Sequence, residues 1–246
     1  FRTAMQYCSQ REQFGKALKD FAQVKEMLSK MKIKLLASRV LLYETCKYVD
    51  LRNAYETLSQ KEGNTAEYRE KEKEISKIAA ILTPMAKAFN TEASNEICYD
   101  AIQCMGGKGY MRGNDAERFY REARITNIYE GTTQMQVIAA IGGIMQRNLE
   151  PLLDELTAHI YTGNLEKYAK QIAELRKLGE ETLNYVEKLA DSDFFDLSAR
   201  KIVESYTLIF IAALLLRDAK AKAERTALCE EFLKEYAEKI KLNFNT

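Results

Sequence analysis

Residues 117–136 read ERFYREARITNIYEGTTQMQ, and this stretch sets the expectation for how the surrounding chain folds. Its charged first part predicts a short helix over residues 116 to about 123, with arginines at three-residue steps. A glycine then interrupts the helical pattern, and a capping-box pattern after it predicts that a new helix begins at about Thr132 or Thr133. The turn between the two helices carries a single carboxylate, that of Glu130.

Glu130 stands between an aromatic residue and a glycine that can reverse the chain. A carboxylate in such a place can be pressed against a bound substrate and lose its water, which makes it a better general base. The N-terminus of the following helix acts in the opposite direction, because it stabilises the anion. The alternative is a loop carboxylate that only helps to cap the next helix, and spacing alone does not decide between the two interpretations.

The composition is that of a globular protein rich in helix. Its 246 residues are 46% apolar, with only two prolines and eleven glycines, so one large domain or two smaller ones can bury a core. Ala, Leu, Glu, Lys and Met are abundant, and these residues lose little conformational freedom on entering a helix. We therefore expect an all-α fold with little or no sheet.

Charge and cysteine content exclude several classes of protein. The net charge of +1 gives no overall field for the capture of nucleic acid or an anionic membrane. The five cysteines lack C-x-x-C spacing and lie far from the lone histidine, so they predict free buried thiols, no metal site and a cytoplasmic location. The longest apolar run, residues 206–216, is too short for a membrane span of about 20 residues and predicts a buried helix.

Helical patterns continue along most of the chain. The sequence begins at Phe1 rather than Met and is helical in pattern at once, so we expect the C-terminal part of a longer protein. Residues 59–73 are dense in charge and predict a solvated connection or the frayed ends of two helices. The other expected helices cover residues 20 to about 58, residues 75–82 and Thr83-Pro84 to Met105, with four more beginning at Pro151, Asn164, Ser198 and Glu224.

Two further segments have the composition of a ligand site. In Gln103-x-x-Gly106-Gly107 the bare backbone can approach a flat or phosphorylated ligand, although a glycine pair is also common where a helix ends. Arg11 offers a rigid donor fork that suits a diphosphate, and its alternative is an ion pair with a neighbouring glutamate.

Four motifs follow one another in the first part of the chain. They are Arg11-x-Gln13-Phe14-Gly15, Gln103-x-x-Gly106-Gly107-x-Gly109-Tyr110, Arg121-x-Ala123-Arg124-Ile125 and Ile128-Tyr129-Glu130-Gly131-Thr132-x-Gln134. In this order they resemble the C-terminal helical domain of the acyl-CoA dehydrogenases. The resemblance implies an up-and-down four-helix bundle over residues 1–147. Residues 148–246 are expected to form a second small helical bundle, as in some larger bacterial members.

The resemblance also implies a reaction. Glu130 matches the base that takes the α-proton of an acyl-CoA thioester while the β-hydrogen leaves as hydride to flavin N5, giving a trans-2-enoyl-CoA. Gly131 matches a position beside the acyl-CoA, and the N–H of Glu130 is expected to polarise the thioester carbonyl. Without the upstream domains that cover the flavin, residues 1–246 alone are expected to be inactive.

FAD is the implied cofactor, and it is shared between subunits. Its implied contacts are Arg11, Phe14, Gln103, Gly106 and Gly107 from the neighbouring subunit, and Thr132 and Gln134 from the subunit that carries Glu130. A homodimer or homotetramer follows, with electron-transfer flavoprotein as the electron acceptor. The alternatives are an acyl-CoA oxidase-like or nitroalkane-type flavoprotein, or a non-catalytic helical oligomerisation module.

Overall fold

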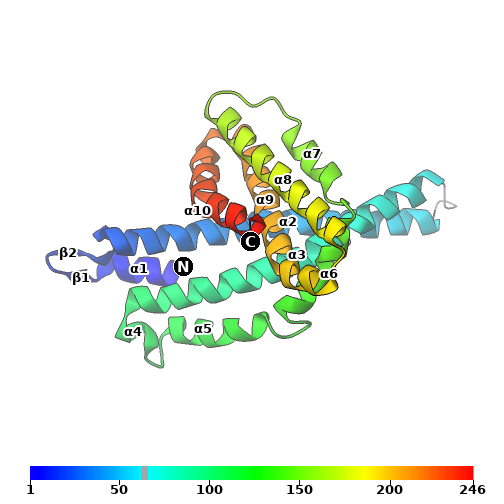
Figure 1. Ribbon diagram of the computed structural model, residues 1–246. Coiled ribbons are helices and arrows are strands. Elements are labelled where there is room, and N and C mark those ends of the chain that lie inside the picture. The colour runs from blue at the N-terminus through cyan, green and yellow to red at the C-terminus, as the bar shows by residue number, and fades with distance from the viewer. Residues whose placement is uncertain (62–65, 246) are drawn as a thin grey trace. The chain divides into compact units, whose positions relative to one another are not determined.

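The computed structural model describes residues 1–61 and 66–245 and confirms the all-α fold (Figure 1). Over these residues the elements are α1 (Arg2–Gln10), β1 (Glu12–Gln13), β2 (Lys16–Ala17), η1 (Leu18–Asp20), α2 (Ala22–Lys61), α3 (Ala66–Met105), α4 (Gly107–Tyr110), α5 (Asp115–Thr126), α6 (Thr133–Met145), α7 (Glu150–Thr157), α8 (Asn164–Leu189), α9 (Ser192–Ala221), η2 (Ala223–Arg225) and α10 (Thr226–Phe244).

The chain divides into two compact units. The first unit comprises Phe1–Arg39 and Lys87–Thr133, and the second comprises Val40–Ala86 and Gln134–Thr246. Helices α2 and α3 each contribute one part to each unit, because both run for 40 residues. The two units are described separately below.

An apolar core holds the first unit together. Ala4 and Cys8 of α1 are fully buried, as is Met31 of α2, and Ala101 and Cys104 of α3 belong to the same cluster. The Cys8 thiol donates a weak hydrogen bond to the carbonyl of Cys104, with 3.7 Å between sulfur and oxygen. The last turn of α1 is thereby fixed beside the last turn of α3.

A two-residue hairpin follows α1. Strands β1 and β2 are antiparallel, with Glu12 opposite Ala17, and the turn consists of Phe14 and Gly15 at φ values of 50° and 79°. Two successive positive φ angles are the signature of a type I′ turn, which fits the twist of paired strands. Phe14 is 93% exposed, so its ring contributes little to the packing of the unit.

Pro84 lies inside α3, so the prediction that a new helix begins at Thr83-Pro84 is wrong. The hydroxyl of Thr83 donates to the carbonyl of Ala79 at 2.8 Å, one turn earlier, and does not cap a new helix. Leu82 and Met85 on either side of this point are fully buried. Their packing outweighs the backbone hydrogen bond that the proline cannot make.

The connection between α2 and α3 is shorter than residues 59–73. Helix α2 continues to Lys61 and α3 begins at Ala66, so most of the charged stretch is the ends of two helices, and residues 62–65 lie outside the described residues. An ion pair of 2.9 Å between Lys71 and Glu74 supports the first turns of α3.

Helix α9 is the central helix of the second unit. Residues 206–216 are all buried, as the sequence predicted, and α9 packs against α7, α8 and α10. Arg217, just beyond this run, forms an ion pair of 2.7 Å with the buried carboxylate of Glu44. Among the described residues, no helix is both long enough and apolar enough to cross a bilayer.

The start of α9 corrects a second prediction. We expected this helix to begin at Ser198, but it begins at Ser192, because Asp191 is its N-cap. The Asp191 carboxylate accepts hydrogen bonds from the N–H groups of Asp193 and Phe194 at 2.9 and 3.0 Å. The short polar run that predicted a break is therefore the cap itself.

The other predicted starts in this region are close to those observed. Helix α8 begins at Asn164, as expected, and α7 begins one residue before the predicted Pro151. Glu224 falls in the 3₁₀ turn η2, and α10 begins two residues later at Thr226.

Candidate functional site

The segment of residues 127–133, here called the Glu130 turn, connects α5 to α6. Helix α5 ends at Thr126 and α6 begins at Thr133, in agreement with the predicted start of that helix. The N–H groups of Ile128 and Tyr129 both donate to the carbonyl of Ile125 at 3.0 Å, which closes the end of α5. The N–H of Thr133 donates to the backbone carbonyl of Asn127 at 3.3 Å, so the turn folds back on itself.

Glu130 adopts a backbone conformation that is unusual for its residue type. Its φ is 52°, and that of Gly131 is 93°, so two left-handed residues follow one another. The left-handed region costs a residue with a side chain about 1–2 kcal/mol. Glu130 is also exposed, so burial of its own side chain does not offset this cost.

Two side chains of α3 hold the Glu130 turn from the same unit. The Lys87 ammonium donates to the carbonyl of Gly131 at 2.6 Å and lies 5.8 Å from the centre of the Tyr129 ring. The hydroxyl of Thr133 donates to the Glu92 carboxylate at 2.6 Å. The backbone is thus tied to α3 on both sides of Glu130.

A third side chain of α3 fixes the helix that leads into the turn. The amide of Asn95 donates to the carbonyl of Ala123 in α5 at 2.9 Å and to that of Thr91 at 2.8 Å. The sequence analysis missed these polar residues of α3, because it considered only the apolar residues of that helix. The signal was present, since Lys87, Thr91 and Asn95 recur at four-residue steps.

The other predicted ligand residues in the first unit gather where α1 and α3 end. The Cys8–Cys104 contact brings these ends together, and the Lys108 ammonium lies 5.4 Å from the centre of the Tyr7 ring. Arg11, Phe14, Gln103, Gly106 and Gly107 all lie in this region and are exposed. No described acidic side chain forms an ion pair with Arg11, so the structure does not support the alternative of a structural ion pair.

The glycine pair leaves its outer face open. A Cβ atom built on Gly106 or Gly107 would meet no atom within 4 Å, whereas one on Gly109 would lie 2.8 Å from the Cβ of Met105. Residues 107–110 form the short helix α4. Gly109 therefore serves close packing, and Gly106 and Gly107 leave room for another molecule.

The structure does not join these residues to the Glu130 turn. Helix α5 separates the residues near Arg11 from the Glu130 turn, and α4 precedes the N-terminal end of α5 (Figure 1). The 12 residues of α5 span about 18 Å. Thr132 is exposed in the turn, and Gln134 is the exposed second residue of α6. The predicted residues thus form two groups, one near Arg11 and one around Glu130.

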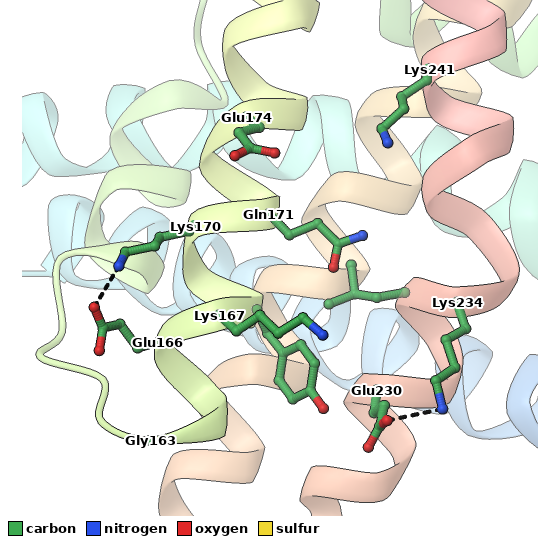
Figure 2. A pocket seen from close by; sticks show the side chains of 11 residues that line it. Gly163, Glu166, Lys167, Lys170, Gln171, Glu174, Glu230, Lys234 and Lys241 are labelled. Atoms are coloured by element: carbon green, nitrogen blue, oxygen red, sulfur yellow. Dashed lines mark hydrogen bonds and ion pairs between the residues drawn. The ribbon is translucent and has the colours of Figure 1, made fainter.

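A groove of about 700 Å³ lies between α8 and α10 of the second unit (Figure 2). Side chains of both charges line it and form two ion pairs: Lys170 with Glu166 at 2.6 Å and Lys234 with Glu230 at 2.9 Å. None of the predicted site residues lines this groove. The candidate site therefore remains at the Glu130 turn.

Comparison with protein families finds matches over most of the chain. Residues 1–144 match the model of the acyl-CoA dehydrogenase C-terminal domain, and residues 147–242 match a second model, described as acyl-CoA dehydrogenase C terminal.

Individual relatives agree with these matches. The chain is 33% identical over 144 residues to the caffeyl-CoA reductase-Etf complex subunit CarC of Acetobacterium woodii, covering 58% of this chain and 32% of that protein. It is 30% identical over 143 residues to the mitochondrial short-chain specific acyl-CoA dehydrogenase of Rattus norvegicus, covering 58% and 29%. The chain thus spans about a third of the length of these relatives.

Solved structures share the fold. An acyl-CoA dehydrogenase complexed with FAD from Bacillus anthracis superposes with a TM-score of 0.77 at 20% identity, over 99% of this chain and 44% of that chain. Caenorhabditis elegans ACDH-11 in complex with C11-CoA gives a TM-score of 0.71 at 20% identity, over 95% of this chain and 39% of that chain.

Proposed function

Because the chain belongs to the acyl-CoA dehydrogenase family, we propose that it supplies the catalytic base of an FAD-dependent acyl-CoA dehydrogenase and that Glu130 is this base. The observation that carries the proposal is the conformation of the Glu130 turn. An exposed carboxylate is held on a left-handed backbone that two side chains of α3 fix in place. Strain of this kind persists where a function requires one geometry.

Glu130 removes the α-proton of the acyl-CoA thioester. Its N–H donates to the thioester carbonyl, which stabilises the negative charge that develops on that oxygen as the proton leaves. Gly131 lies beside the acyl chain, where the absence of a side chain allows close approach. The carboxylate acts as a base only when substrate and cofactor surround it, so we further propose that residues 1–246 alone are inactive.

FAD is the proposed cofactor, and when bound it accepts the β-hydrogen of the substrate. The residues near Arg11 suit its diphosphate, because an exposed guanidinium, the Gln103 amide and an open glycine backbone gather there. These residues would hold the FAD of a neighbouring subunit, whereas Thr132 and Gln134 would contact the FAD of their own. The enzyme is accordingly a homodimer or homotetramer.

We propose that the two matched regions are two domains, residues 1–147 and 148–246. The two family-model matches support this division, whereas the compact units of the structure cut across it. Electron-transfer flavoprotein is the proposed electron acceptor, because the Acetobacterium relative is named as a subunit of a caffeyl-CoA reductase-Etf complex. The proposed location is the cytoplasm.

The test uses the full-length protein with FAD bound. We expect it to oxidise an acyl-CoA with electron-transfer flavoprotein as acceptor, and Glu130→Gln to lower the rate by about 10²- to 10⁴-fold. Oxygen consumption in place of acceptor reduction would favour the acyl-CoA oxidase-like or nitroalkane-type alternative. A colourless protein without flavin absorbance would favour the non-catalytic helical module.

A further inference from the structure

We propose that Lys87, acting together with Glu92, is the residue that positions the Glu130 turn for proton abstraction. This inference rests on the assignment of Glu130 as the base. Lys87 is a positioning residue and not a catalytic one, because it contacts the backbone and an aromatic ring of the turn.

The turn needs contacts from outside itself to keep its shape. Glu130 and Gly131 have φ values of 52° and 93°, and a residue with a side chain leaves the left-handed region unless the surrounding structure holds it there. The hydrogen bonds within the turn fix its two ends, at Ile128, Tyr129 and Thr133. Lys87 of α3 adds contacts on either side of Glu130, with Tyr129 and Gly131.

Side chains of α3 contact the residues on either side of Glu130, whose own side chain must stay accessible to substrate. Lys87 holds the carbonyl of Gly131 and lies over the ring of Tyr129, the residues after and before Glu130. The Glu92 carboxylate accepts a hydrogen bond from the hydroxyl of Thr133. Residues 129, 131 and 133 are thereby fixed on α3, while the side chain of residue 130 is exposed.

The hydrogen bond from Lys87 to the carbonyl of Gly131 is of a strong type. A hydrogen bond from an ammonium to a carbonyl is charge-assisted, and this one is 2.6 Å long. Lys87 is half-buried, so water and salt screen its charge less than that of an exposed lysine. A shift of the base by about 1 Å can lower a rate by about 100-fold, so a small movement of the turn is enough to affect proton abstraction.

The experiment separates proton abstraction from oxidation. An acyl-CoA with sulfur in place of its β-carbon cannot lose a β-hydrogen to flavin, but its α-hydrogen can still exchange. In D₂O the Glu130 carboxylate takes the α-proton and leaves the thioester enolate, the carboxylic acid exchanges its proton with solvent, and a deuteron returns to the α-carbon. Mass spectrometry of the ligand, bound to the full-length flavoprotein, gives the exchange rate.

We expect Lys87→Met to lower the saturated exchange rate by about 10- to 100-fold and to change the half-saturating ligand concentration by less than about 3-fold. Lys87→Arg keeps a charged donor and is expected to restore most of the rate. The matched control is Lys77→Met, which removes an exposed lysine of the same helix and should exchange at the wild-type rate. Backbone amides of residues 128–134 should exchange faster in Lys87→Met, independently of any ligand.

Two results would overturn the inference in different ways. Wild-type exchange in Lys87→Met, with exchange lost in Glu130→Gln, would remove the role of Lys87 and leave the proposed base intact. Wild-type exchange in Glu130→Gln would overturn both proposals. If Lys87→Met does not fold, Thr133→Val breaks the contact with Glu92, and a wild-type exchange rate in that variant would equally contradict the inference.

Discussion

The Glu130 turn and residues 206–216 of α9 are stabilised in opposite ways. Every residue of the α9 stretch is buried, so its stability comes from the removal of apolar surface from water. The Glu130 turn is largely exposed and depends on a few hydrogen bonds of defined geometry. Burial of the α9 stretch stabilises the fold but does not hold an exposed side chain in one position. The contacts of the Glu130 turn hold Glu130 in a defined position but add little to the stability of the fold. Changes in the two regions should therefore separate stability from activity.

The largest expected effect on stability is at the centre of α9. Phe210 is fully buried, and Phe210→Ala should lower the free energy of unfolding by about 3–5 kcal/mol through lost burial and the cavity left behind. Denaturant unfolding of the full-length protein measures this loss. The rate per folded, flavin-loaded molecule should stay near that of the wild type, and a loss below about 1 kcal/mol would contradict the role of this core.

A second effect on stability concerns the ion pair between Arg217 of the same helix and Glu44 of α2. Burial acts to raise the pKa of the Glu44 carboxyl, but hydrogen bonds from Arg217 and Lys47 outweigh it and hold that pKa below its ordinary value. The resulting stability is present above the unfolded pKa of about 4.3 and is lost as the pH falls through the lower folded value. Glu44→Gln should lower the free energy of unfolding at pH 7 by about 1.5–3 kcal/mol.

Unfolding curves at decreasing pH test this assignment. The difference between wild type and Glu44→Gln should shrink as the pH falls from about 4.3 through the lower folded pKa of Glu44, because the wild-type carboxylate becomes protonated over this range. A difference that stays constant over this range would show that the ion pair does not stabilise the second unit.

A matched pair of glycines in α6 separates close packing from helix propensity. A Cβ on Gly143 would lie 2.4 Å from Cγ1 of Ile81, whereas one on Gly142 would meet nothing within 4 Å. Gly143→Ala should cost about 1–3 kcal/mol of unfolding free energy, and Gly142→Ala should gain up to about 1 kcal/mol. Equal effects of the two changes on thermal unfolding would contradict the close packing of α6 against Ile81.

The smallest expected effect on stability is in the hairpin that carries Phe14. An Asn-Gly pair is the preferred sequence of a type I′ turn, so Phe14→Asn should leave stability unchanged or raise it by up to about 1 kcal/mol. Because we assign the exposed ring to FAD, the same change should reduce the flavin retained on gel filtration. Full flavin content in Phe14→Asn would remove that assignment.

Much of the fold could be predicted from the sequence because helical periodicity is a local signal. The buried stretch of α9 and the start of α8 followed from apolar runs and turn residues. The errors at Pro84 and Asp191 arose where one residue type has two uses. A proline that usually begins a helix is tolerated inside α3 because its neighbours are buried, and a polar run that resembles a break contains the N-cap of α9.

The candidate site could be predicted only in part. Glu130 and Gly131 are adjacent in sequence, so their pattern identified the Glu130 turn. The residues that hold the turn could not be found in this way, because Lys87 and Gly131 are 44 residues apart and Glu92 and Thr133 are 41 apart. Such contacts depend on which faces of α3 and α5 meet in the first unit. A polar row with four-residue spacing shows that a face exists but not what it contacts.

The central claim is that Glu130 removes a proton from an acyl-CoA, and one measurement tests it most directly. The full-length flavoprotein is mixed rapidly with acyl-CoA, and the loss of the yellow flavin absorbance is followed before any acceptor is added. We predict that Glu130→Gln retains its flavin and bleaches about 10²- to 10⁴-fold more slowly than the wild type. Bleaching of Glu130→Gln at the wild-type rate would contradict the claim.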